Sequence, residues 1–322
     1  MTWSVGIDLG GTNIAVGLVS EDYRIADREH EKTLAPRSAA SLAETMAGCV
    51  FRLLERNRLQ LSELAAIGLG LPGMVQEKTG LMIEAANLGL YQIDFASLFR
   101  PYFPHTPLKI SNDGDCAIWG EFLAGEAKEH ESVLMLTLGT GIGGGFVCDH
   151  RIFRGASGLG IEPGHMVVET EGARLCTCGR HGCLEMYASI RGLNLLIREG
   201  MQEDPSSSLH HLIKPDNPSY NVRIFFDLVR AEDAAALRIL DRYTAYLASG
   251  IRSLSVLYRP HLILLGGGIS NAGDLLLQPL RETLDPDKAG DYILSLPPVA
   301  VSRLGNDAGI IGAAMLHLES PS

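Results

Sequence analysis

The side chains with the clearest chemical capacity lie in one short segment, residues 160–188. Three cysteines occur there with the spacing Cys176-x-Cys178-x₄-Cys183, and His165 precedes the first of them by eleven positions. Three thiolates and one imidazole are the donor set of a closed tetrahedral zinc site, which leaves no position for water or substrate. The segment therefore predicts a structural Zn²⁺ rather than a catalytic one.

Two alternatives to this metal site are open. His181 lies inside the loop and offers a second imidazole as the fourth ligand. The three thiols can also be free; a disulfide would leave one of them over, and the other cysteines, at 49, 116 and 148, are scattered in apolar contexts typical of a reducing compartment. We favour the metal and expect it to fold a loop that lacks a hydrophobic core of its own.

A second candidate, Asp113, follows an apolar segment that reads as a strand. It stands in an Asn-Asp-Gly turn, where a carboxylate can project into a cleft and accept a proton from a hydroxyl group. Asn112 and Asp113 are also residue types that cap a following helix. On spacing alone the capping interpretation is the stronger one.

Three glycine-rich turns follow apolar segments, at residues 8–13 (DLGGTN), 137–145 (TLGTGIGGG) and 265–270 (LGGGIS). Glycine lets backbone amides approach an anion, so such turns can hold phosphates. One alone is usually only a turn, but three in one chain indicate a nucleotide. A Rossmann site is excluded because the chain continues as a strand after the G-x-G-x-x-G match at 139–144, and no P-loop motif occurs.

The elements that must position these residues are strands and helices in alternation, which predicts an α/β protein. Ser41 and Glu44 offer a capping box for the first helix. The expected strands lie at 3–9, 14–19, 24–33, 64–75, 107–113, 261–270 and 299–305, and residues 132–149 are expected to form two strands joined by a glycine turn. The expected helices lie at 38–59, 114–127, 184–200, 224–258 and 306–319.

An internal similarity relates the two ends of this series. Shifting the first hairpin by 129 positions places Asp8 on Thr137 and Gly10 on Gly139, and both segments read strand, Gly/Thr turn, strand. Two copies of one hairpin indicate a duplicated architecture, with a cleft between two halves.

Composition narrows the class of partner. With 38 acidic and 27 basic residues the net charge is -11, which argues against nucleic acid or an anionic membrane as the main partner. A polyanionic substrate can still bind locally, through backbone amides and a cation. No apolar run has the length of a membrane span, and the start, MTWSVGIDLGG, lacks the features of an export signal. We therefore expect a cytoplasmic protein.

In chain order, DLGGTN, SND, LGTGIGGG and LGGG resemble the sugar kinases of the actin-like ATPase fold. IEPGH followed by CTCGRHGCLE is similar to the ROK family (repressors, open reading frames and kinases), and the resemblance covers essentially the whole chain. It implies a two-lobed α/β fold, duplicated and ribonuclease H-like, with a zinc loop. The expected lobes are residues 1–115 joined by a C-terminal helix at 305–322, and a larger lobe, 116–304, with the zinc loop and nucleotide site.

The same resemblance implies a role for each matched residue. Asp113 becomes the catalytic base, against the capping interpretation, and His165 is preferred to His181 as the zinc ligand. The implied sugar ligands are Asn87, Asn112, Glu162, His165 and Glu185. The implied Mg²⁺ and ATP residues are Asp8, Gly10, Gly11, Thr12, Asn13, Thr137, Gly139, Thr140 and Gly141, with Gly266, Gly267 and Gly268 behind the adenosine.

Two positions depart from the family pattern. Ile161 stands where a glycine usually precedes the glutamate, which puts the pose of Glu162 in question. Leu90 stands where many glucokinases of the family carry an aromatic residue.

The implied reaction is transfer of a phosphoryl group from ATP, with Mg²⁺, to the 6-hydroxyl of a hexose. Glucose is the first expectation; N-acetylmannosamine, N-acetylglucosamine, mannose, allose and fructose are alternatives, and a homodimer or higher homo-oligomer is expected. Repressors of the family carry a DNA-binding segment before the first glycine turn, whereas seven residues precede Asp8 here. A sugar-binding module without catalysis would be expected to have lost Asp8 or Asp113.

Overall fold

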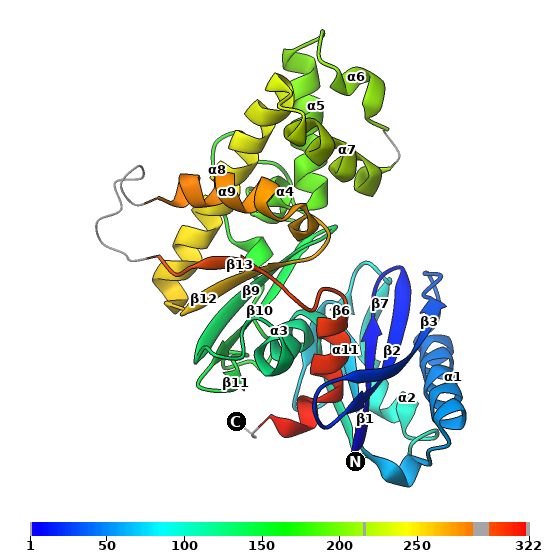
Figure 1. Ribbon diagram of the computed structural model, residues 1–322. Helices are drawn as coiled ribbons and strands as arrows, with labels where there is room; N and C mark the ends of the chain where they lie inside the picture. The colour runs from blue at the N-terminus through cyan, green and yellow to red at the C-terminus, as the bar shows by residue number, and fades with distance from the viewer. Residues whose placement is uncertain (1, 215–216, 286–295, 320–322) are drawn as a thin grey trace. The chain divides into compact units, whose positions relative to one another are not determined.

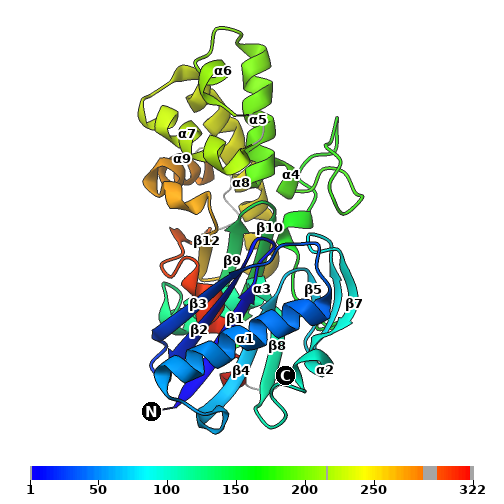
Figure 2. The same ribbon diagram turned by 90° about the vertical axis from the view of Figure 1, so that its right-hand side faces the viewer.

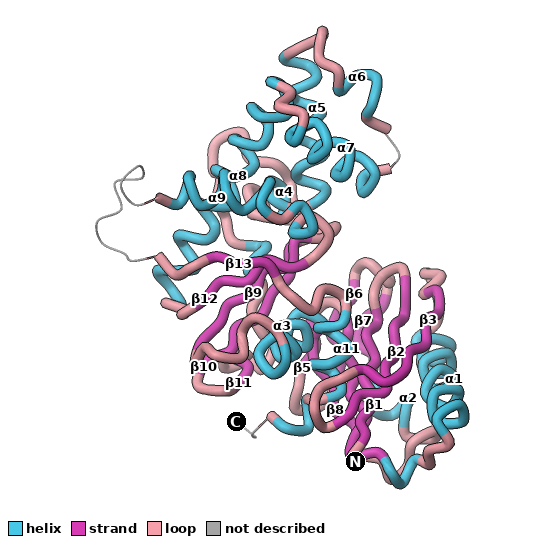
Figure 3. The backbone as a smooth tube through the Cα atoms, viewed as in Figure 1, coloured by secondary structure: helices cyan, strands magenta, loops and turns pink. Residues whose placement is uncertain are grey.

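The computed structural model describes residues 2–214, 217–285 and 296–319. Strands and helices alternate along them, as expected (Figures 1 and 3). The chain divides into two compact units, the first made of residues 1–133, 145–161 and 303–322 and the second of 134–144 and 162–302. The lobes expected from the sequence have other boundaries and stay a prediction.

The first unit contains a five-stranded sheet with the order β3-β2-β1-β4-β8. Its strands are β1 (Trp3–Leu9), β2 (Asn13–Ser20), β3 (Ile25–Lys32), β4 (Leu64–Leu71) and β8 (Leu108–Asn112). The first three form an antiparallel meander, and β4 and β8 run parallel to β1. Helix α1 (Ala39–Asn57) packs on one face of this sheet, where its apolar stripe is buried (Figure 2).

Helix α11 (Asp307–Ala314) packs on the same sheet at unusually short range. A Cβ atom on Gly6 would lie 1.9 Å from the carbonyl oxygen of Ile310, and one on Gly68 would lie 1.7 Å from that of Ala313. Helix α3 (Asp113–Ala124) meets α11 in the same way, since a Cβ on Gly312 would lie 1.7 Å from the Cys116 carbonyl oxygen. Glycine at these positions allows contact between backbones, which fixes the helix that carries Asp113.

The second sheet has the order β11-β10-β9-β12-β13. Its strands are β9 (Ser132–Leu138), β10 (Ile142–Cys148), β11 (Arg151–Ile152), β12 (Leu262–Gly266) and β13 (Val299–Val301). When the strands of each sheet are numbered in chain order, both sheets follow the order third, second, first, fourth, fifth. The duplication predicted from the two glycine hairpins is therefore confirmed at the level of sheet topology.

The remaining elements complete the two units. A small antiparallel sheet joins β5 (Met74–Gln76), β6 (Leu81–Ala85) and β7 (Leu90–Asp94), and α2 (Phe95–Phe99) follows it. The other helices are α4 (Glu185–Ala188), α5 (Ile190–Glu203), α6 (Leu209–Leu212), α7 (Pro218–Arg230), α8 (Ala234–Tyr258) and α9 (Asp274–Leu284). Single turns of 3₁₀ helix lie at Leu61–Glu63, Pro163–His165, Ser270–Ala272 and Leu316–Leu318.

Three local predictions were wrong, each at a helix cap. Helix α1 starts one turn earlier than the Ser41/Glu44 box, because the Ser38 side chain accepts the Ser41 amide. The helices expected at 184–200 and 224–258 are each two helices, interrupted before caps at Ser189 and Asp233. A capping side chain offers the backbone an alternative to the helical ladder, and periodicity alone does not detect it.

Of the helices in the described part of the chain, none has the length and apolar character needed to cross a membrane.

Candidate active site

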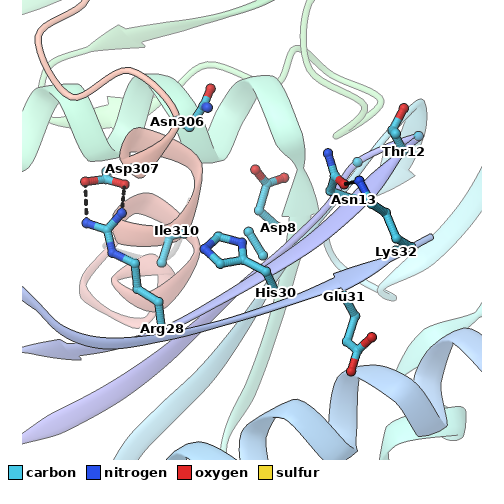
Figure 4. Close-up of a pocket in the computed structure, with 13 residues that line it drawn as sticks. Asp8, Thr12, Asn13, Arg28, His30, Glu31, Lys32, Asn306, Asp307 and Ile310 are labelled. Carbon is cyan, nitrogen blue, oxygen red and sulfur yellow. Dashed lines mark hydrogen bonds and ion pairs between the residues drawn. The ribbon is translucent and has the colours of Figure 1, made fainter.

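The first glycine turn connects β1 to β2 and borders a cavity of about 770 Å³ in the first unit (Figure 4). The Gly10 amide donates to the Asn13 carbonyl oxygen at 2.9 Å, which closes the turn. Thr33, the residue after β3, fixes the turn, because its hydroxyl donates to the Gly10 carbonyl oxygen at 2.7 Å. Asp8, at the end of β1, lines the same cavity. This is a pre-formed concave site with backbone amides, and Asp8 is the carboxylate that lies next to the glycine turn in the chain.

Two of the site carboxyl groups expected from the sequence, Asp8 and Asp113, have raised pKa values. Burial raises the pKa of Asp8 to about 7, and the negative charge of Asp113 contributes to the rise. Burial also raises the pKa of Asp113 to about 6. Carboxylates that are desolvated and influence each other in this way are typical of cation-binding and acid–base sites.

Asp113 is the first residue of α3, and Asn112 is its N-cap. The Asn112 Oδ1 atom accepts the amides of Gly114, at 2.7 Å, and Asp115, at 3.2 Å, while its Nδ2 donates to the Gly73 carbonyl oxygen at 2.7 Å. The capping interpretation therefore holds for Asn112. It does not compete with a catalytic role for Asp113, because the cap is what fixes the start of the helix from which that carboxylate projects.

Asn87, expected to touch sugar, lies beside the first glycine turn. A Cβ atom built on Gly11 would stand 3.1 Å from the Asn87 Nδ2 atom. The Asn87 side chain is exposed, in the turn between β6 and β7. The first unit thus brings together Asp8, Gly10, Gly11, Thr12, Asn13 and Asn87 around the turn, and Asn112 and Asp113 at the start of α3.

The other two glycine turns meet in the second unit. The Ile190 amide donates to the Gly139 carbonyl oxygen at 2.8 Å, which ties the turn after β9 to the start of α5. The turn after β12 packs on the end of β9, where the Ile269 amide donates to the Leu138 carbonyl oxygen at 3.1 Å. Gly267 has a φ of 82°, and a Cβ there would stand 2.7 Å from Leu138 backbone atoms, so glycine is required.

The zinc ligands expected from the sequence form one cluster, also in the second unit. The donor atoms of His165, Cys176, Cys178 and Cys183 all lie within 4.8 Å of one another. The Cys178 and Cys183 sulfurs are 3.7 Å apart, and Cys176 Sγ is 3.6 Å from His165 Nδ1. Zn–S bonds of about 2.3 Å and Zn–N bonds of about 2.0 Å in a tetrahedron give edges of roughly 3.8 Å and 3.6 Å, so the four groups fit a zinc ion.

The loop around this cluster has more anchoring than we expected. Cys176, Cys183, Met186 and Tyr187 form a small buried cluster, and the Tyr187 ring stacks on Tyr246 at a centroid distance of 4.3 Å. The Arg174 guanidinium lies 4.6 Å from the centre of the Tyr187 ring and also donates to the Met186 carbonyl oxygen. The expectation that the loop has no core of its own was therefore wrong.

Glu185 connects this loop to the second glycine turn. Its Oε2 atom accepts the Ile142 amide at 3.0 Å, and its Oε1 accepts the Thr177 hydroxyl at 3.2 Å. Glu162 is exposed, two residues after Gly160, which takes the left-handed φ of 80°. The turn that glycine allows is thus present one position before Ile161, so Ile161 need not adopt it.

Sequence reasoning missed three basic residues on the cavity of the first unit. Arg28, His30 and Lys32, from β3, line it, and Lys32 lies beside the glycine turn (Figure 4). Lys32 donates to the Asn13 Oδ1 atom at 2.8 Å. A signal was present: basic residues occupy every second position of this strand, and alternate residues of a strand share a face.

Comparison with known proteins relates this chain to one family. The model of the ROK family matches residues 4–320. A glucokinase of Halalkalibacterium halodurans is 33% identical over 98% of this chain and 94% of its own, and a glucokinase of Thermotoga maritima is 34% identical over 98% and 97%. The crystal structure of a ROK family glucokinase from Streptomyces griseus, in complex with glucose and AMPPNP, superposes with a TM-score of 0.80 at 28% identity and covers 98% of both chains.

Proposed function

The chain belongs to the ROK family, and from this premise we propose that it is an ATP-dependent sugar kinase that transfers a phosphoryl group to the 6-hydroxyl of glucose. It has the α/β fold of the ROK sugar kinases, with duplicated sheets that fit the actin-like ATPase architecture. Glucose is preferred to the other hexoses because the glucokinases above are about one-third identical over their full length.

The observation that carries the proposal is the setting of Asp113. Its carboxyl group is fixed at the first turn of α3, and burial raises its pKa to about 6. A base works best when its pKa lies near the working pH, where it is ionised yet still basic enough to take a proton. We assign Asp113 the proton of the sugar 6-hydroxyl as that oxygen attacks the terminal phosphorus.

Asp8 is the residue that would hold Mg²⁺. Its pKa of about 7 marks a carboxylate that the protein itself leaves poorly compensated, and a bound cation would stabilise the ionised form. Magnesium bridges and neutralises phosphate oxygens in this class of reaction. The turn from Gly10 to Asn13 would receive the phosphates through its amides, and the turns at 137–141 and 266–268 would hold the rest of the nucleotide.

Glu162, His165, Glu185, Asn87 and Asn112 are proposed to bind the hydroxyl groups of the sugar. For His165 one nitrogen, Nδ1, faces the cysteine cluster, which leaves Nε2 for a hydroxyl. The zinc would hold this histidine in place and take no part in the chemistry.

The test is a coupled ADP-release assay with MgATP over a panel of hexoses, including mannose, fructose and the N-acetylated amino sugars. We expect the highest kcat/KM for glucose. A higher kcat/KM for an N-acetylated amino sugar would replace the substrate assignment, and no turnover with any hexose would overturn the proposed function.

A further inference from the structure

The last six residues of β3 alternate between acidic and basic types, and they read Asp27, Arg28, Glu29, His30, Glu31 and Lys32. Because successive side chains of a strand point to opposite faces, this segment separates into an acidic face and a basic face. The acidic face contacts helix α1, whereas the basic face borders the cavity of the first unit. This difference indicates a function for the basic face.

The acidic face is neutralised by helix α1. Arg52 pairs with Glu29 at 3.0 Å and with Glu31 at 2.9 Å, and Arg56 pairs with Asp27 at 2.7 Å. Figure 4 shows Glu31 directed toward that helix and away from the basic side chains. Glu31 also borders the cavity of the first unit, but its carboxylate pairs with Arg52. All three acids are therefore paired with arginines of α1.

The basic face is directed toward the cavity that holds Asp8 and the first glycine turn. Arg28 is neutralised there, because Asp307 accepts two hydrogen bonds from its guanidinium, at 2.8 and 2.7 Å. Lys32 differs, since its ammonium contacts a neutral group, the Asn13 Oδ1 atom. The pairing of β2 with β3 sets Asn13 directly opposite Lys32, so the sheet register places this charge at the turn.

We propose that Lys32 is a substrate-contacting residue that binds the terminal phosphates of ATP at the first glycine turn. The inference rests on the proposed function and adds a residue to it. Residues 10–13 contain no cationic side chain, and the chain as a whole carries a charge of -11. A triphosphate bound there needs positive charge beyond backbone amides, and a lysine beside the turn supplies it as a mobile point charge.

His30 lies two residues before Lys32 on the same face, and Figure 4 shows its imidazole next to Ile310 and Asp8. It extends the basic side of the cavity away from the turn.

A purely structural role is the competing account, in which the Lys32–Asn13 hydrogen bond only joins two strands. The two accounts differ in what a charge change does. If the Lys32–Asn13 bond is only structural, another polar side chain at residue 32 should largely replace it. If Lys32 contacts phosphate, its positive charge is required, and its loss should weaken only ligands that carry the terminal phosphates.

The experiment measures the dissociation constants of AMPPNP, with Mg²⁺, and of AMP by calorimetry on the full chain. Variants are Lys32→Gln, Lys32→Arg and, as a charge-matched control, Lys109→Gln on β8, an exposed lysine outside the cavity. We expect Lys32→Gln to weaken AMPPNP about 10-fold, the size of one charge-assisted hydrogen bond. AMP binding should stay unchanged, and Lys32→Arg should restore most of the AMPPNP affinity.

Equal AMPPNP affinity in Lys32→Gln and wild type would overturn the inference, as would an equal loss for AMP. A melting temperature of Lys32→Gln equal to that of the Lys109→Gln control excludes misfolding. If Lys32→Gln melts at a lower temperature, the AMPPNP affinity of Lys32→Arg alone tests the inference. Wild-type protein that binds no AMPPNP would instead refute the proposed function, so the two failures are distinguishable.

Discussion

The carboxylate of Glu185 accepts a hydrogen bond from the backbone amide of Ile142, at 3.0 Å, so the end of the cysteine loop is joined to the second glycine turn. The other oxygen of this carboxylate accepts the hydroxyl of Thr177, which stands between two of the cysteines. Glu185 was expected only to read the sugar. Its position indicates that it also fixes the turn proposed to hold phosphate.

This link predicts the effect of Gly141→Ala. A Cβ atom at residue 141 would stand 2.3 Å from Glu185 Oε2, so the carboxylate must move and its bond to Ile142 is lost. We expect the KM for ATP to rise roughly 10-fold, the cost of one charge-assisted hydrogen bond. Gly48→Ala is the control, because this glycine lies in α1, outside the glycine turns, and a Cβ there would stand 3.6 Å from its nearest neighbour. Equal effects of the two alanines would count against the link.

The packing of α11 predicts a second glycine effect. In Gly68→Ala the new methyl group would stand 1.7 Å from the Ala313 carbonyl oxygen, and its three nearest neighbours are all backbone atoms of α11. Overpacking of this kind costs about 1–3 kcal/mol or more of unfolding free energy. Urea denaturation measures it, with Gly48→Ala as control, since that residue lies inside α1 with 3.6 Å to its nearest neighbour. The control should be neutral or stabilising by about 0.5–1 kcal/mol.

The cysteine cluster predicts bound metal. Elemental analysis of fresh protein should give about one zinc per chain, and Cys178→Ser should lose most of it and melt at a lower temperature. Cys148→Ser, outside the cluster, should keep the zinc content and the melting temperature of the wild type. Because the loop retains its anchors at Arg174 and Tyr187, we expect a metal-depleted protein with its far-ultraviolet circular dichroism largely preserved. Wild-type protein without zinc, or a Cys178→Ser variant that retains it, would refute this site.

The raised pKa of Asp113 predicts an acid limb in the pH profile. Burial disfavours the ionised form, so the base is present above pH 6 and is lost as the pH falls through about 6. With saturating Mg²⁺, which keeps Asp8 ionised, kcat should fall about tenfold per pH unit below that point. At low Mg²⁺ the limb should move toward 7, the pKa of Asp8. A kcat that is constant down to pH 5 would contradict the assignment.

Features of this molecule that depend on residues close together in the sequence could be predicted, and features that depend on distant residues could not. The glycine hairpins, the buried strands and the cysteine spacing are local patterns, and they predicted the duplicated sheets and the grouping of His165 with three cysteines. The spacing of His181 does not exclude it as the fourth zinc ligand, so only the structure could decide between it and His165. In the structure His181 is exposed and lies outside the cluster.

The rest depends on pairing between distant segments. Lys32 reaches the first glycine turn only through the register of β2 with β3, and the Gly68–Ala313 contact joins residues far apart in the chain. Helix boundaries failed for a different reason, since Ser38, Ser189 and Asp233 act through single capping hydrogen bonds. A helical sequence pattern contains several polar residues, and the pattern alone does not identify which of them caps the helix N-terminus.

The central claim, that one carboxylate takes the proton of a hexose 6-hydroxyl, is tested most directly by product formation in Asp113→Asn. Glucose 6-phosphate is quantified by ³¹P NMR after incubation with MgATP and glucose, with melting curves to show that the variant is folded. Asparagine keeps the shape and removes the base, so we predict that kcat falls about 10²–10⁴-fold while glucose and AMPPNP still bind. A folded variant that forms glucose 6-phosphate at the wild-type rate would contradict the account.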